Sequence, residues 1–144
     1  MHQESYSATV EHIVDGDTCD ILVDLGLNIL KRERIRLAGI DAPETRSRDL
    51  DEKRLGLDAK AYLERALLTR RIRIKIVPTG KSPYDKFGRL LAYVYDDALC
   101  AAGTSINEQM LADGYAFAYD GKSARGAHDL EQLRTTRRAA GTLD

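Results

Sequence analysis

The stretch DAKAYLERALLTRRIRIKI, residues 58–76, carries two hydrophobic periods in succession. Its first part places apolar side chains at helical spacing, and arginines follow at the end of the helix dipole that favours positive charge. Its second part alternates, with Ile72, Ile74 and Ile76 separated by basic residues, as in a half-buried strand. The stretch therefore predicts a helix over 58–69 followed directly by a strand.

Strand signals flank this stretch on both sides. Residues 10–14 and 19–23 are rich in β-branched residues and are joined by an Asp-Gly turn, which favours a tight hairpin. Residues 32–37 alternate so that three arginines share one sheet face and form a basic stripe. A fifth strand is predicted over 90–95. The charged run over 46–54 has no apolar period and is expected to be a loop.

Two further helices complete the predicted order of elements. The segment Ser105-Ile106-Asn107-Glu108 has the spacing of a capping box, and Gly114 marks the stop of that helix. The last helix is predicted over about 127–140. Five strands, with a helix between the third and the fourth, indicate an α+β, mainly β fold. We expect a single domain over residues 1–144, a five-stranded OB-type Greek-key barrel with about three α-helices.

The charge of the chain excludes a global attraction to nucleic acid. Its 144 residues include 22 basic and 23 acidic side chains, which give a net charge of -1, so any basic surface must be local. No run of eighteen apolar residues occurs, and we expect no membrane partner. The N-terminus has no signal-peptide pattern, which predicts a cytoplasmic protein as the chain stands, or a secreted or periplasmic one if a signal was removed.

Three short motifs carry the residues that could perform chemistry. They are Val14-Asp15-Gly16-Asp17-Thr18, Arg36-Leu37-Ala38-Gly39-Ile40-Asp41-Ala42-Pro43-Glu44, and Asp85-Lys86-Phe87-Gly88-Arg89-Leu90-Leu91-Ala92-Tyr93. Their carboxylates and arginines could hold a divalent metal, activate a water and clamp a phosphodiester. Each motif also has an ordinary alternative, namely a hairpin turn for Asp-Gly-Asp, a surface side chain for Glu44, and solvated arginines for Arg36 and Arg89.

The sequence resembles the staphylococcal nuclease family, calcium-dependent nucleases built on an OB barrel. The resemblance runs from about Tyr6 to Leu143, and it includes a fourth stretch, residues 107–116, in the family's order. All four motifs in that order make a chance match improbable. The resemblance implies the same barrel and the same chemistry.

The resemblance also implies a metal site and a group that acts on water. Asp17 and Asp41 match the family's metal ligands, and the backbone carbonyl of Ala42 falls at the third ligand position, so that Ca²⁺ is the expected cofactor. Glu44 matches the family's general base, or the group that orients the attacking water. Pro43 stiffens the segment that carries it.

Substrate contacts follow from the same resemblance. Arg36 and Arg89 match the two arginines that bracket the scissile phosphate. Lys86 matches a lysine near the terminal phosphate of the nucleotide, and Tyr119 is the nearest candidate for the aromatic residue that stacks on a base. Phe87 stands where the prototype has a tyrosine, so one hydrogen bond to phosphate is absent.

The implied function is a calcium-dependent endonuclease that hydrolyses DNA and also RNA with low sequence specificity. It would leave 3'-phosphate products, prefer single-stranded substrates and work as a monomer. One alternative is a catalytically weak or inactive OB-fold module that binds nucleic acid. Another is a protein-interaction domain on the same scaffold, which no sequence feature favours.

Overall fold

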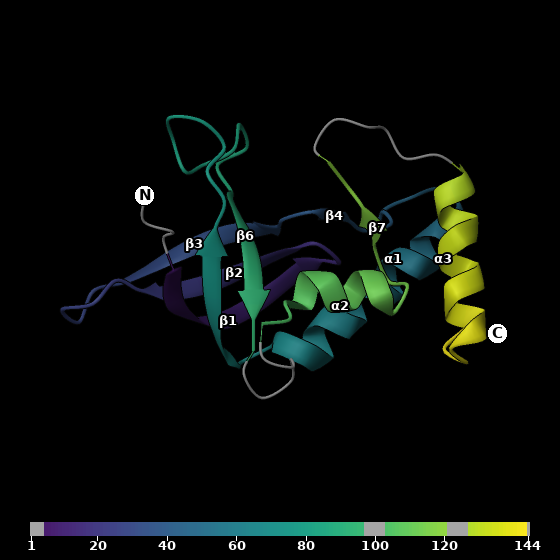
Figure 1. Cartoon of the computed structure of the whole chain (residues 1–144), viewed down its shortest axis with the longest axis horizontal. Helices are drawn as coiled ribbons and strands as arrows, with labels where there is room; N and C mark the ends of the chain where they lie inside the picture. Colours follow the sequence, from purple (N-terminus) through teal and green to yellow (C-terminus); the bar gives the residue numbers. More distant parts are fainter. Residues whose placement is uncertain (1–4, 97–102, 121–126, 144) are drawn as a thin grey trace.

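The computed structural model of the chain describes residues 5–96, 103–120 and 127–143. Five strands close into a barrel in the order β1-β2-β3-β6-β5 (Figure 1). Neighbouring strands are antiparallel, except that β3 and β6 run parallel. The predicted five-stranded OB-type barrel is confirmed. Its strands are β1 (Ser5–Asp15), β2 (Thr18–Asp24), β3 (Leu30–Leu37), β5 (Arg71–Ile76) and β6 (Leu90–Tyr95).

Apolar and polar residues alternate along the strands, and the apolar side chains fill the barrel interior. In β5, Ile72 and Ile74 are buried while Arg71 and Arg73 are exposed, as the sequence predicts. The basic face of β3 is also present, but acidic side chains of β1 and β2 pair with two of its arginines. Arg32 pairs with Glu11 of β1, and Arg34 pairs with Asp20 of β2.

Helix α1 (Leu50–Leu67) packs beside β1 and begins eight residues earlier than the expected start at residue 58. The loop prediction over 46–54 is therefore wrong for its second half. Asp49 caps the helix, because its carboxylate accepts hydrogen bonds from the N–H groups of Asp51 and Glu52. Helix capping, which does not depend on an apolar period, begins α1 inside the charged run.

Two further helices occur among the described residues. Helix α2 (Ile106–Ala112) begins at the predicted cap, where Ser105 accepts a hydrogen bond of 3.1 Å from the N–H of Glu108. Helix α3 (Ala127–Ala139) lies at the end of the molecule opposite the β2–β3 hairpin (Figure 1). Its buried Arg137 donates to Asp58 of α1 over 3.0 Å. In the described part of the chain, no helix is long and apolar enough to cross a membrane.

A small second sheet lies between the barrel and α3 (Figure 1). It consists of β4 (Ile40–Asp41) and β7 (Phe117–Ala118), which pair antiparallel. Strands of two residues have no sequence period and were not predicted. Tyr115 and Phe117, which lie at and just before β7, are buried. The pair holds Asp41 outside the barrel, at the end where the turn between β1 and β2 lies.

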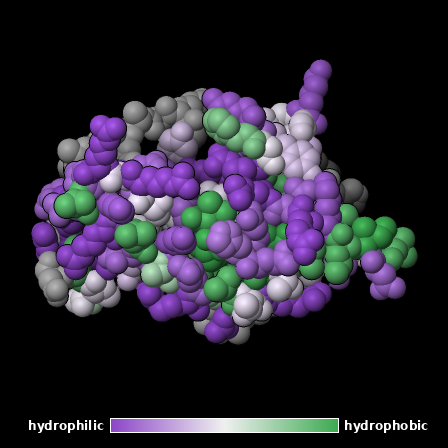
Figure 2. Space-filling view, turned by 180° about the vertical axis from the view of Figure 1, so that it is seen from behind, coloured by the Kyte–Doolittle hydropathy of each residue, from purple (hydrophilic) through white to green (hydrophobic). Residues whose placement is uncertain are grey.

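The turn that joins β2 to β3 forms an apolar tip. Its exposed side chains include Leu27, which is 95% exposed, and both Leu27 and Asn28 adopt positive φ. The hairpin projects from the barrel at the left of Figure 1, and apolar surface gathers at the right end of the turned view in Figure 2. This hairpin tip consists of Leu25, Leu27, Ile29 and Leu30.

Candidate active site

Asp17 is a buried carboxylate in the turn between β1 and β2. Its Oδ1 accepts a hydrogen bond of 2.9 Å from the Thr18 hydroxyl, and its Oδ2 accepts one of 3.0 Å from the N–H of Ala42. Burial, the largest influence, disfavours its charged form. A hydrogen bond from Asp15 and the charge of Arg36 outweigh burial and hold the pKa of Asp17 below its usual value. The carboxylate is therefore ionised and fixed.

Asp15 belongs to the same site, although the sequence analysis assigned it only to a turn. Its Oδ1 accepts a hydrogen bond of 3.1 Å from the N–H of Asp17. Burial and the adjacent Asp17 carboxylate raise the pKa of Asp15 to about 7. Two carboxyl groups this close titrate as a pair, and one proton stays with them up to near-neutral pH. The Asp-Gly-Asp spacing was the signal available in the sequence.

Arg36 joins Asp17 to Asp41. Its Nη1 lies 3.4 Å from Asp17 Oδ2, and its Nη2 donates to Asp41 Oδ1 over 3.3 Å. Nη1 also donates to the carbonyl of Ile40 over 3.0 Å. With only 13% of its side chain exposed, Arg36 is not a solvated strand arginine. The structure brings together both predicted carboxylate ligands and one predicted phosphate-binding residue.

The segment after β4 carries the remaining acidic residue. Ala42 and Pro43 are buried, and Glu44 is exposed. Two peptide units separate Ala42 from Glu44, so their Cα atoms lie within about 7.6 Å. Ala42 itself is tied to Asp17 through its N–H. The backbone of Glu44 therefore lies close to Ala42, on a segment that the bond from Ala42 to Asp17 anchors.

Arg89 is held in a tight turn before β6. The carboxylate of Asp85 accepts hydrogen bonds from the N–H groups of Phe87 and Arg89, and it pairs with Arg89 Nε over 2.9 Å. These contacts hold the pKa of Asp85 below its usual value, against the opposing effect of burial. The pair leaves the terminal guanidinium nitrogens of Arg89 outside it. Leu90, the next residue, pairs with Ile35, so the two predicted arginines come from adjacent strands.

Aromatic rings accompany both arginines. The ring of Tyr119 lies 5.8 Å from Arg36 Cζ, and the Tyr119 N–H donates to the carbonyl of Gly39 over 3.0 Å. Phe87 is 70% exposed, with Arg89 Cζ 5.3 Å and Lys86 Nζ 5.2 Å from its ring centre. The structure thus groups Tyr119 with Arg36, and Lys86 with Arg89. Phe87 belongs to the second group. The sequence had indicated only that Phe87 lacks the hydroxyl of the tyrosine found at this position in the family prototype.

The donor set suits a hard cation. Two carboxylates and a backbone carbonyl are oxygen ligands of the kind that Ca²⁺ takes in proteins. In residues 5–96, 103–120 and 127–143, no group of three or more His, Cys, Asp or Glu side chains has the arrangement of a metal site. With only two carboxylates and a carbonyl from the protein, most ligands would be waters or substrate oxygens.

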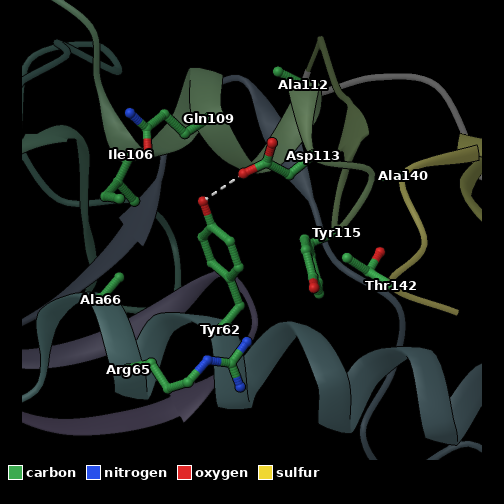
Figure 3. Close-up of a pocket in the computed structure, with 10 residues that line it drawn as sticks. All are labelled: Tyr62, Arg65, Ala66, Ile106, Gln109, Ala112, Asp113, Tyr115, Ala140 and Thr142. Atoms are coloured by element: carbon green, nitrogen blue, oxygen red, sulfur yellow. Dashed lines mark hydrogen bonds between the residues drawn. The ribbon is translucent and has the colours of Figure 1, made fainter. Parts of the chain in front are cut away.

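A separate pocket of about 490 Å³ lies between α1, α2 and the chain that follows α3 (Figure 3). Tyr62 of α1 points across it, and its hydroxyl donates to Asp113 over 2.9 Å. Tyr115 lies beside Tyr62, with 4.5 Å between ring centres. None of the predicted site residues lines this pocket. The candidate site is therefore separate from this pocket.

Comparison with known proteins shows which family the chain belongs to. Residues 34–142 match the family described as staphylococcal nuclease homologue, and the match includes Arg36, Asp41, Glu44 and Arg89. The chain belongs to the staphylococcal nuclease family. Asp17 lies upstream of the matched range.

Several curated relatives of this staphylococcal nuclease homologue are named as nucleases. The thermonuclease of Staphylococcus intermedius is 36% identical over 92 residues, which are 64% of this chain and 49% of that protein. Endonuclease YhcR of Bacillus subtilis (strain 168) is 31% identical over 141 residues, 94% of this chain and 11% of that protein. The micrococcal nuclease of Shigella flexneri is 32% identical over 118 residues, which are 79% of this chain and 59% of that protein.

The chain spans less than two thirds of the length of each of these three relatives. Family membership and the names of the relatives support a nuclease function, that is, an enzyme that hydrolyses phosphodiester bonds of nucleic acid.

Proposed function

We propose that this staphylococcal nuclease homologue is a calcium-dependent endonuclease that hydrolyses DNA and RNA with low sequence specificity and leaves 3'-phosphate products. The observation that carries the proposal is the contact of one guanidinium, that of Arg36, with the carboxylates of both Asp17 and Asp41. Anchored acids can hold a metal ion that assists phosphodiester hydrolysis, and an adjacent arginine can bind the phosphate.

Asp17, Asp41 and the carbonyl of Ala42 would hold the cation. When bound, Ca²⁺ would polarise a phosphoryl oxygen and make a coordinated water more acidic. The hydrogen bond from Ala42 N–H to Asp17 Oδ2 supports this ligand set, because it keeps the two ligand-bearing segments together.

Arg36 and Arg89 would bind the oxygens of the scissile phosphate. A planar guanidinium matches phosphate oxygens and stabilises the charge that grows on them in the transition state. Asp85 supports this role for Arg89, because its ion pair to Nε keeps the arginine in place. Arg36 would exchange part of its contact with the carboxylates for contact with phosphate.

Glu44 would act on the attacking water, either as the base that takes its proton or as the group that orients it. The water oxygen attacks phosphorus opposite the 5'-oxygen, and the bond from phosphorus to that oxygen breaks. The leaving oxygen takes a proton to become a 5'-hydroxyl, and the phosphate stays on the 3'-oxygen. The exposure of Glu44 supports this role, because an attacking water can reach it.

Single-stranded substrates are the preferred class in this proposal, and the protein acts as a monomer. Lys86 and Tyr119 would bind substrate, with Tyr119 stacking on an unpaired base beside the phosphate that Arg36 contacts. The cation–π contact between Arg36 and Tyr119 supports this assignment. Contacts to phosphate and to base faces carry little sequence information, hence the low specificity.

The test is degradation of heat-denatured DNA with Ca²⁺, with Mg²⁺ and with chelator, for the wild type and for Glu44→Gln. Glu64→Gln, an exposed glutamate of α1, is the matched control. We expect calcium-dependent cleavage that Glu44→Gln lowers to a small residual rate and Glu64→Gln preserves, with 3'-phosphate ends in the product masses. A wild type that binds oligonucleotide but cleaves in no metal would replace the proposal with the alternative, an OB-fold module that binds nucleic acid without cleaving it.

A further inference from the structure

Residue 56 of α1 is a glycine at a place where no side chain fits. A Cβ added to Gly56 would lie 2.6 Å from the carbonyl oxygen of Pro43. It would also lie 2.7 Å from the carbonyl carbon of Glu44 and 2.8 Å from its carbonyl oxygen. These neighbours are backbone atoms, which cannot rotate away as a flexible side chain can. The Pro43–Glu44 backbone therefore lies directly on the helix at Gly56.

The same helix face supports the other acidic segment. A Cβ added to Gly16 would lie 2.6 Å from the Cβ of Ala59 and 2.7 Å from the Cβ of Ala42. Gly56 and Ala59 are three residues apart and so share one face of α1, separated by about 4.5 Å along its axis. One rigid helix thus carries both the turn that contains Asp17 and the segment that contains Glu44.

We propose that Gly56 is a positioning residue for Glu44, and this rests on the proposed function. By letting α1 approach the Pro43–Glu44 backbone, Gly56 sets where the Glu44 side chain begins relative to Asp17 and Asp41. The Glu44 side chain is exposed, and the position from which it extends is set by its backbone, which lies against Gly56. A methyl group at residue 56 pushes the backbone of Pro43 and Glu44 away from the helix.

The test is Gly56→Ala, with a single-stranded DNA oligonucleotide as substrate and Ca²⁺ present. We expect kcat to fall by about 10- to 100-fold while KM stays within about twofold, because a shift near 1 Å of a reacting group has this cost. Leu57→Ala, at the next position on α1 and largely exposed, is the matched control and keeps the wild-type kcat. An unchanged kcat in folded Gly56→Ala would overturn the inference.

A double mutant separates positioning from a general loss of structure. In the Glu44→Gln background, Gly56→Ala should cause no further fall in the residual kcat, because the group that it displaces is already disabled. An equal fall in both backgrounds would show that Gly56 acts independently of Glu44 and would overturn the inference. If Gly56→Ala does not fold under assay conditions, the same kinetics are measured at reduced temperature with a stabilising osmolyte.

A second readout needs neither metal nor activity. In the metal-free protein, Gly56→Ala should move the backbone amide resonance of Glu44 and leave that of Asp20, on the far strand β2, in place. A Glu44 resonance that does not move would contradict the inference. A wild type without nuclease activity would instead overturn the proposed function, so the two failures are distinguishable.

Discussion

The N–H of Ala42 donates a hydrogen bond of 3.0 Å to Asp17 Oδ2, across 25 positions of the chain. Asp17 lies in the turn that joins two barrel strands, whereas Ala42 follows a strand of the small second sheet. This bond therefore joins the two parts of the molecule that carry the proposed metal ligands.

Asp17→Asn should lose both metal binding and stability. The amide keeps the shape of the carboxylate but not its charge, which leaves a buried site with an unbalanced Arg36. We expect calcium-dependent cleavage to be lost and the free energy of unfolding to fall by about 1–3 kcal/mol. Urea denaturation and calcium titration measure the two effects. The control is Asp51→Asn, at an exposed residue of α1, which should change the free energy of unfolding by less than about 1 kcal/mol. Equal effects of the two variants would contradict this assignment.

Arg36→Ala should lower kcat by about 100-fold or more, because the negative charge on the phosphate oxygens in the transition state loses a hydrogen-bond donor. It also leaves the Asp17 and Asp41 carboxylates without the cation between them. We therefore expect Ca²⁺ to raise the melting temperature of Arg36→Ala more than that of the wild type. Calorimetry with and without Ca²⁺ tests this, and Arg34→Ala, which breaks an exposed pair with Asp20, is the control. Unchanged cleavage would remove Arg36 from the mechanism.

Asp85→Asn should show a loss of stability that depends on pH. The pKa of Asp85 in the folded protein is below the usual value of 3.8, so its folded state binds fewer protons in acid than its unfolded state. Its contribution is complete above the unfolded-state pKa, and it disappears as the pH falls through the folded-state pKa. We expect wild type and Asp85→Asn to differ at neutral pH and to converge in strong acid. A difference that is constant with pH would contradict this sign.

Loss of the Asp85 contact should also weaken substrate binding through Arg89. In Asp85→Asn, the guanidinium of Arg89 keeps its charge but loses its ionised partner. We expect KM for single-stranded DNA to rise by about 5-fold, the value of roughly 1 kcal/mol of lost preorganisation. Steady-state kinetics at fixed Ca²⁺ measure it. An unchanged KM would mean that Arg89 does not need Asp85 to bind phosphate.

Phe87→Ala and Tyr119→Ala should each weaken oligonucleotide binding by about 5- to 150-fold, since stacking of one base contributes about 1–3 kcal/mol. Phe87 is largely exposed, so its replacement should leave the stability unchanged. Fluorescence anisotropy with a labelled single strand in low salt measures both variants. Leu50→Ala removes an equally exposed apolar side chain and should bind as the wild type does. Normal binding by Tyr119→Ala would contradict the assignment of Tyr119 as the stacking residue, and normal binding by Phe87→Ala would show that the exposed Phe87 ring does not contact the bases.

Much of the fold follows from periods and caps that are local in the sequence. The alternation of Ile72 and Ile74 and the cap at Ser105 are both confirmed, because each depends on neighbours a few residues away. The predicted start of α1 at residue 58 was wrong. The prediction followed the amphipathic period, which does not extend into the charged run, whereas the helix begins there because Asp49 caps it. The β4–β7 pair was missed because two-residue strands form only when distant segments meet.

The site was predictable as a set of residues and not as an arrangement. Motifs identified Asp17, Arg36 and Asp41, and the structure places Arg36 in contact with both carboxylates. The raised pKa of Asp15 depends first on burial, which local sequence does not specify. The exposure of Phe87 beside Arg89 depends on how the turn at Asp85 folds. The roles of Glu44, Lys86 and Tyr119 stay predictions.

The apolar hairpin tip has a practical consequence for how the protein behaves in concentrated solution. Leu27 meets water over nearly its whole surface, with a positive φ that a leucine rarely adopts. The tip contains none of the residues assigned to chemistry. Leu27→Asn would remove apolar surface and favour the left-handed backbone at once, so colloidal solubility can be raised there while turnover stays the same.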